Sequence, residues 1–130
     1  MQTEIQKTLR ELKETLNRIE STPTMLRGTF STAYRRCGKP NCRCANPREQ
    51  AHPFRRLSWT EMGKQYTRTI SESDARWVEK ATRAYRQYKQ RRKEVKNLCA
   101  KLEEQLSSIE AQILARTRSE RAELGPRDER

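Results

Sequence analysis

Apolar residues near the start of the chain recur at the alternating spacing of a helix seam. Between residues 2 and 20 the spacings are four, three, four and three, and the apolar positions are Ile5, Leu9, Leu12, Leu16 and Ile19. Charged residues fill the gaps, which is typical of a helix that pairs along a narrow stripe. Pro23 restricts the residue before it, so we expect a coiled-coil helix within residues 1–22.

A longer helical pattern covers residues 71–118. No glycine or proline interrupts it, and Ser71 with Asp74 three residues later resembles a capping box. We predict one coiled-coil helix of about 47 residues, roughly 70 Å long. Its seam keeps the same alternation, broken only by one arginine: Val78, Ala81, Tyr85, Tyr88, Arg92, Val95, Cys99, Leu102, Leu106, Ile109 and Ile113. The charged residues 119–130 are predicted to form a flexible tail.

Between the two helices the pattern changes to that of strands. Residues 28–36, 54–60 and 65–70 alternate small, aromatic and β-branched side chains with polar ones, and Gly63 within residues 61–64 suits a hairpin turn. Residues 23–70 also hold four of the five prolines and three of the four glycines. A three-stranded antiparallel β module is therefore predicted for residues 23–70.

The two helices differ in length, and the difference predicts a partner. A tight return of the chain would place the first helix beside residues 74–92, which leaves the later seam uncovered. We expect self-association, most simply a homodimer, with another protein as the second option. The oligomerisation residues would be Val95, Cys99, Leu102, Leu106, Ile109 and Ile113. In that seam Cys99 is interpreted as a small apolar core residue.

Composition agrees with long helices. Only 32% of the 130 residues are apolar and 35% are charged, which suits a coiled coil better than a globular core. Disorder is the competing interpretation, but the regular apolar spacing argues against it. No signal peptide or membrane-length apolar run is visible, so we expect a cytoplasmic protein, free or nucleoid-associated, with reduced thiols.

The strongest chemical motif is a cysteine loop. Cys37, Cys42 and Cys44 lie within eight residues, and His52, the only histidine, follows eight residues later. Three thiolates and one imidazole form a common structural zinc set, which leaves no open position for a catalytic water. We predict a structural zinc ion held by these four residues. The predicted fold class is therefore α+β, with long coiled-coil helices flanking a small zinc-bound three-stranded antiparallel β module.

Positive charge is concentrated in the middle of the chain. The net charge is +12, with +8 in residues 21–70, +5 in residues 71–98, zero in residues 1–20 and −1 in residues 99–130. This excess favours a polyanionic partner, and nucleic acid is the prediction. The candidate contacts in the β module are Arg35, Arg36, Lys39, Arg43, Arg48, Arg55, Arg56, Lys64 and Arg68. Those in the helix are Arg83, Arg86, Lys89, Arg91, Arg92, Lys93 and Lys96.

Aromatic residues alternate with these cations. Trp59, Tyr66, Tyr34 and Phe54 could stack on unpaired bases, but such residues more often form the small core of a β module. We favour the core interpretation for these four.

A resemblance supports this interpretation. The runs Leu26-Arg27-Gly28, Tyr34 to Cys44, His52-Pro53 and Leu57-Ser58-Trp59-Thr60 resemble a family of small prokaryotic proteins known only as a domain of unknown function. The resemblance implies the cysteine loop, a Leu-Ser-Trp strand and a long C-terminal helix. Members are often encoded beside mobile elements and recombinase or transposase genes. The glycine-rich stretch expected before the histidine is replaced here by residues 46–51.

These observations predict a non-catalytic accessory protein. We expect it to bind nucleic acid, DNA rather than RNA, and to act as an adaptor for a mobile-element recombinase, transposase or nuclease. The alternatives are an RNA-binding subunit of a ribonucleoprotein and a coiled-coil assembly protein with an acidic protein partner. We expect no enzymatic activity, small-molecule substrate or membrane contact, because no carboxylate cluster, nucleophile elbow or phosphate loop is visible.

Overall fold

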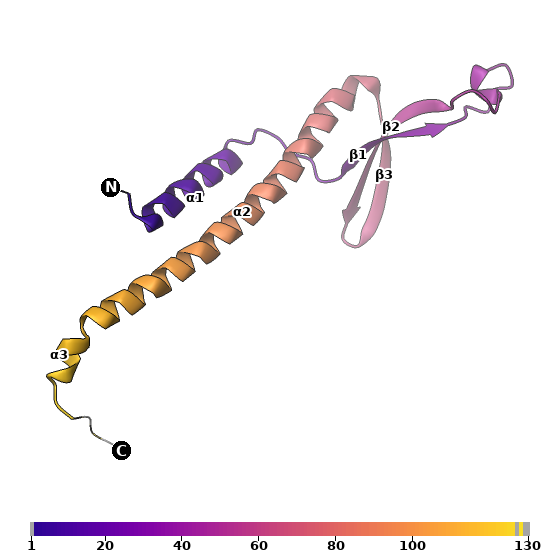
Figure 1. The fold of residues 1–130 in the computed structure, drawn as a ribbon. Coiled ribbons are helices and arrows are strands. Elements are labelled where there is room, and N and C mark those ends of the chain that lie inside the picture. Colours follow the sequence, from indigo (N-terminus) through magenta and orange to yellow (C-terminus); the bar gives the residue numbers. More distant parts are fainter. Residues whose placement is uncertain (1, 127, 129–130) are drawn as a thin grey trace. The chain divides into compact units, whose positions relative to one another are not determined.

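The computed structural model describes residues 2–126 and 128 and has the predicted α+β fold (Figure 1). In chain order the elements are α1 (Glu4–Glu20), β1 (Thr29–Arg35), the short 3₁₀ helix η1 (Arg43–Ala45), β2 (His52–Glu61), β3 (Lys64–Ile70), α2 (Glu72–Arg116) and α3 (Arg118–Ala122). No helix among the described residues is long and apolar enough to cross a membrane.

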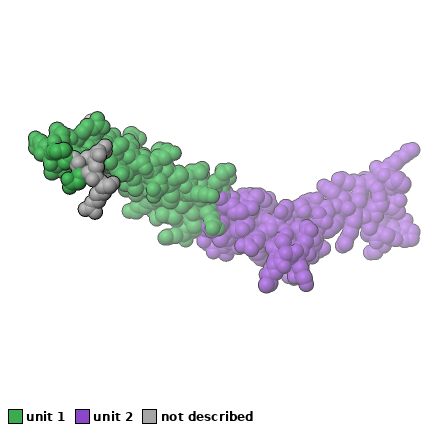
Figure 2. Space-filling view, turned by 90° about the horizontal axis from the view of Figure 1, so that it is seen from below, with its two compact units in different colours: residues 1–21, 90–130 green, residues 22–89 purple. Residues whose placement is uncertain are grey.

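The elements form two compact units, coloured separately in Figure 2. Unit 1 contains residues 1–21 and 90–130, and unit 2 contains residues 22–89. Helix α2 therefore contributes its first part to unit 2 and the remainder to unit 1. The short helix α3 occupies part of the predicted tail, of which residues 127, 129 and 130 lie outside the described residues.

Unit 1 is a pair of antiparallel helices (Figure 1). Helix α1 begins with a capping box formed by Thr3 and Gln6, and its end lies near Arg91, whose Nη1 donates to the Arg18 carbonyl oxygen at 3.5 Å. The expected pairing of the first helix with residues 74–92 is wrong, because α1 belongs with the part of α2 after residue 89. Residues 22–27 have no regular structure, and the Leu26 N–H bonds to the Ala81 carbonyl oxygen, so this connecting segment lies beside that part of α2.

The buried face of α1 differs from the predicted seam at two of its five positions, while Ile5, Leu12 and Ile19 are half-buried. Thr8 and Thr15 are only 1% and 6% exposed, whereas Leu9 and Leu16 remain 49% and 41% exposed. The Thr8 hydroxyl donates to the Glu4 carbonyl oxygen at 3.1 Å, and Thr15 makes the equivalent bond within α1. Each threonine can therefore present its methyl group to α2 without leaving a buried hydroxyl unpaired.

The predicted oligomerisation residues divide between two environments. Val95 and Leu102 are half-buried, as are Leu98 and Gln105, which sequence periodicity did not include. The remaining predicted seam residues are exposed: Cys99, Leu106, Ile109 and Ile113. Cys99 is thus not a core residue within one chain.

The sheet of unit 2 has the predicted antiparallel order β1-β2-β3. Strand β2 begins at His52, two residues earlier than expected, where His52 pairs with Arg35. Glu61 pairs with Lys64 across a two-residue turn, and Met62 and Gly63 both have positive φ, +51° and +79°. Two consecutive positive φ angles define the type I′ turn, which matches the twist of a hairpin.

A small core joins the sheet to the first turns of α2. Leu57 on β2 is buried together with Val78, Ala81 and Thr82 on α2. The Leu26 backbone N–H donates to the Ala81 carbonyl oxygen at 2.9 Å, which ties the segment before β1 to the helix. With so few buried side chains, the hydrophobic contribution to the stability of this unit is small.

Replacing Gly28 by alanine is expected to destabilise unit 2 by about 2–3 kcal/mol. Gly28 has φ +140°, and a Cβ there would lie 2.8 Å from the Ser58 carbonyl oxygen and 3.0 Å from Leu57 Cδ1. Thermal unfolding followed by circular dichroism measures the loss. The matched control is Gly63→Ala, which has φ +79° but no described heavy atom within 4 Å of the added Cβ. Equal melting temperatures for the two variants would contradict a role for the close contact.

Candidate metal centre and basic cleft

The four predicted metal ligands lie at one end of the sheet, on the connection between β1 and β2. Cys37 follows β1, Cys42 and Cys44 belong to the 3₁₀ helix and its N-cap, and His52 is the first residue of β2. The strands fix the two ends of this connection through the pair between Arg35 and His52. The 3₁₀ turn brings Cys42 and Cys44 back toward those ends.

The ligand atoms of these four residues converge. All of them lie within 4.8 Å of one another. The Sγ atoms of Cys37 and Cys44 are 3.4 Å apart, and Cys42 Sγ is 3.0 Å from His52 Nε2. A tetrahedral ion with bonds of about 2.3 Å needs ligand atoms roughly 3.8 Å apart. The cluster can therefore hold one metal ion, as the Cys-x4-Cys-x-Cys spacing predicted.

Arg36 holds the loop around the cluster. Its guanidinium donates to the carbonyl oxygens of Cys44, Asn46 and Glu49, the last two at 3.1 and 3.2 Å. A guanidinium carries five N–H donors in a fixed plane, so one side chain can fix three loop carbonyls. Arg36, predicted as a phosphate contact, is thus engaged in folding the loop.

The thiols of the cluster have different electrostatic environments. The backbone of Cys44 and the His52 side chain donate hydrogen bonds that lower the pKa of Cys42 to about 6. The Cys37 backbone N–H lowers the pKa of Cys44. Burial and the neighbouring sulfurs together raise this pKa by more, so the net shift is upward. Cys42 is therefore largely a thiolate at neutral pH, which is the form that binds metal.

Several predicted nucleic-acid contacts are engaged within the protein. Arg43 pairs with Glu49 at 3.1 Å, Arg83 pairs with Glu79 at 3.0 Å, and Arg55 Nη1 donates to Thr32 at 3.1 Å. The guanidinium of Arg35 lies over the Phe54 ring, 4.7 Å from its centroid. Other predicted contacts have exposed side chains: Lys39, Arg48, Arg56, Lys64, Arg68, Arg86, Lys89, Arg92, Lys93 and Lys96.

Three cations of unit 2 line one cleft of about 410 Å³. They are Arg27, Arg86 and Lys89, and Arg27 and Lys89 also approach the Tyr85 ring, at 5.7 and 5.3 Å from its centroid. The other lining residues are neutral: Gly28, Thr29, Ser58, Trp59, Thr60 and Gln65. We call this site the basic cleft. Hydroxyl groups beside three uncompensated cations suit a phosphate group.

Sequence reasoning missed Arg27. It precedes the first strand, and no periodic pattern marks it as a neighbour of residues on the long helix. The backbone bond from Leu26 to Ala81 places that segment against α2. The only sequence signal was the Leu26-Arg27-Gly28 run, which contributed to the family resemblance.

Comparison with known proteins identifies the family. A family model described as a domain of unknown function, DUF6788, matches residues 2–80, more than half of the chain. The matched range contains α1, the whole sheet and all four ligands of the candidate metal centre. No curated protein and no solved structure matches the chain. The chain is therefore a member of the DUF6788 family of domains of unknown function.

Proposed function

We propose that this protein is a non-catalytic, nucleic-acid-binding adaptor whose β module is stabilised by a structural zinc ion. The observation that carries the proposal is the basic cleft, where Arg27, Arg86 and Lys89 lie together and no lining residue is acidic. The net charge of +12 supplies long-range attraction for a polyanion. DNA is the favoured partner, because relatives that the sequence resembles are often encoded beside recombinase and transposase genes.

Zinc is the proposed metal because of the donor set. Three thiolates with one imidazole are soft to borderline ligands, which suit zinc better than magnesium or calcium. Four protein ligands fill a tetrahedron, so the ion would stabilise the loop rather than activate water. The loop between β1 and β2 buries only Cys44 among its side chains, so metal bonds would replace the missing core.

Two copies are proposed to associate through unit 1. Leu9 and Leu16 each follow a buried threonine of α1 by one position, and Cys99 and Leu106 each follow a half-buried residue of α2 by one position. In an antiparallel pair of right-handed helices, the residue after a contact residue points to the same side of the pair on both helices. The exposed apolar residues therefore form one face, suited to pairing with a second copy.

A salt series tests nucleic-acid binding. We expect the full-length protein to bind labelled duplex DNA at low salt, with log K falling against log salt at a slope of about −7 if eight phosphates are contacted. Arg86→Gln with Lys89→Gln should reduce the magnitude of the slope by about 1.8. Fluorescence anisotropy measures the binding constants of the wild-type protein and of the variant at each salt concentration.

The matched control removes the same charge elsewhere. Lys13→Gln with Lys101→Gln neutralises two exposed cations of unit 1 and should leave the slope unchanged. Equal effects of both pairs would indicate a response to net charge alone. If duplex DNA, single-stranded DNA and structured RNA all fail to bind at low salt, the proposed function is wrong and the assembly alternative is favoured.

A further inference from the structure

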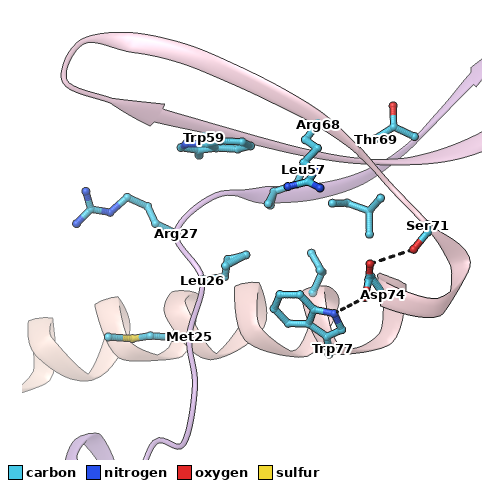
Figure 3. A pocket seen from close by; sticks show the side chains of 12 residues that line it. Met25, Leu26, Arg27, Leu57, Trp59, Arg68, Thr69, Ser71, Asp74 and Trp77 are labelled. Carbon is cyan, nitrogen blue, oxygen red and sulfur yellow. Dashed lines mark hydrogen bonds between the residues drawn. The ribbon is translucent and has the colours of Figure 1, made fainter.

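A second pocket of unit 2 lies between the sheet and the first turns of α2 (Figure 3). Its volume of about 530 Å³ is within the usual range for pockets that bind small organic groups. Apolar side chains and two tryptophans form much of its lining, with polar groups among them: Met25, Leu26, Arg27, Leu57, Trp59, Arg68, Thr69, Ile70, Ser71, Asp74, Trp77 and Val78. We call this site the tryptophan pocket.

Trp77 is held in place although its side chain is exposed. The residue is 53% exposed, yet its Nε1–H donates to Asp74 Oδ1 at 2.9 Å. The Ser71 hydroxyl donates to the other oxygen of the same carboxylate at 3.0 Å. Ser71 and Asp74, expected to form a capping box, instead bond to each other through their side chains and orient the indole. An exposed aromatic ring with a fixed orientation is preorganised to stack on another flat ring.

Trp59 forms a second aromatic surface of the pocket. It comes from β2, and its ring stacks on that of Tyr66 with centroids 5.6 Å apart. Figure 3 shows Trp59 on the sheet side and Trp77 on the helix side, with Leu26 and Leu57 between them. The exposed indole of Trp77 therefore offers a flat surface on which a ring can stack, beside the aliphatic side chains of the pocket.

The tryptophan pocket adjoins the basic cleft. Arg27 and Trp59 line both sites, so an occupant of one lies next to an occupant of the other. The cleft contributes cations, and the pocket contributes aromatic rings together with the Arg68 guanidinium and the Asp74 carboxylate. A nucleotide carries the matching pair of groups, an anionic phosphate beside a flat base with hydrogen-bond donors and acceptors.

We propose that unit 2 binds a nucleotide whose base is unpaired, with the phosphate in the basic cleft and the base in the tryptophan pocket. This inference rests on the proposed nucleic-acid binding and specifies it further. A base inside a duplex is stacked on both sides and cannot enter the pocket. Single strands, frayed ends and junctions therefore bind more tightly than a blunt duplex. The cations of the adjoining basic cleft favour a nucleotide over an apolar side chain of a partner protein.

Intrinsic fluorescence tests the proposal without any substitution. Trp59 and Trp77 are the two tryptophans of the chain, and both line the pocket. Titration of the full-length protein with a short oligothymidylate should quench this fluorescence, because stacked bases quench indoles. A blunt duplex at the same phosphate concentration should bind with much less quenching. Equal quenching by both would contradict the entry of an unpaired base.

Trp77→Ala should weaken single-strand binding by about 5- to 150-fold, the usual range for the loss of one stacked base. Duplex binding should change less than twofold, and Trp77→Phe should retain most of the single-strand affinity. The control is Met62→Ala, because Met62 is 98% exposed at the hairpin turn and lines neither site. Circular dichroism of each variant checks that the fold is retained.

The outcomes separate this inference from the proposed function. If Trp77→Ala weakens single-strand and duplex binding equally, or weakens neither, the base-binding inference is overturned while nucleic-acid binding stands. If the wild-type protein binds no nucleic acid, the proposed function itself fails.

Discussion

Cys44→Ser is expected to release the metal ion and to unfold the connection between β1 and β2. Cys44 is 2% exposed and its sulfur lies 3.4 Å from the Cys37 sulfur, so the substitution removes a ligand that no other side chain of the loop can replace. Structural zinc contributes about 10–16 kcal/mol of apparent binding energy in small domains, far more than the few buried side chains of this loop can supply. Elemental analysis should show zinc falling from one equivalent per chain to none.

Cys99→Ser is the matched control for this prediction. Cys99 is exposed in unit 1 and does not belong to the cluster, so the variant should keep one equivalent of metal per chain. Chelation of the wild-type protein should reproduce the effect of Cys44→Ser on the circular dichroism spectrum. Reduced native protein without bound metal, or a folded Cys44→Ser variant with a full equivalent of zinc, would show that the zinc proposal is wrong.

Leu106→Asp with Ile113→Asp is expected to convert the proposed dimer into a monomer. These residues are 53% and 48% exposed within one chain, so the substitutions should leave the helix pair folded. Each apolar side chain contributes about 1.5–3 kcal/mol when buried, and a dimer would bury four of them, which gives roughly 6–12 kcal/mol. Sedimentation velocity measures the change in mass, and circular dichroism measures helix content.

Two controls locate the interface on α2. Ala100→Asp with Ser107→Asp introduces the same charge at the same spacing, roughly 120° away around the helix, so the dimer should persist. Leu102→Asp should behave differently from both pairs, because Leu102 is half-buried in unit 1 and its substitution should destabilise the helix pair itself. A monomeric wild-type protein would refute the proposed association.

Local patterns in the sequence were sufficient to predict much of the fold. Alternating side chains and a glycine at residue 63 determine the hairpin, because a type I′ turn depends only on its own backbone angles. The long helix follows from 45 uninterrupted residues of helical pattern. The metal cluster could also be predicted, because three cysteines on one short loop and a single histidine leave few other arrangements.

Other features depend on contacts between segments that are distant in the sequence. A heptad pattern identifies the apolar stripe of a helix but does not fix how the helix is rotated against its partner. In the structure Thr8 and Thr15, and not Leu9 and Leu16, lie on the buried face. Composition gives the total charge but does not tell which groups each cation contacts. In the structure Arg36 donates to loop carbonyls, whereas Arg27 lines the basic cleft.

Spacing along the chain was sufficient to predict the two long helices, the three strands and the four residues that can hold a metal, but not the short helices η1 and α3. The folded chain was needed to find which part of α2 pairs with α1, which cations lie together and that Trp59 and Trp77 line one pocket. Side-chain packing and hydrogen-bond geometry select among rotations and pairings that the linear pattern leaves equivalent.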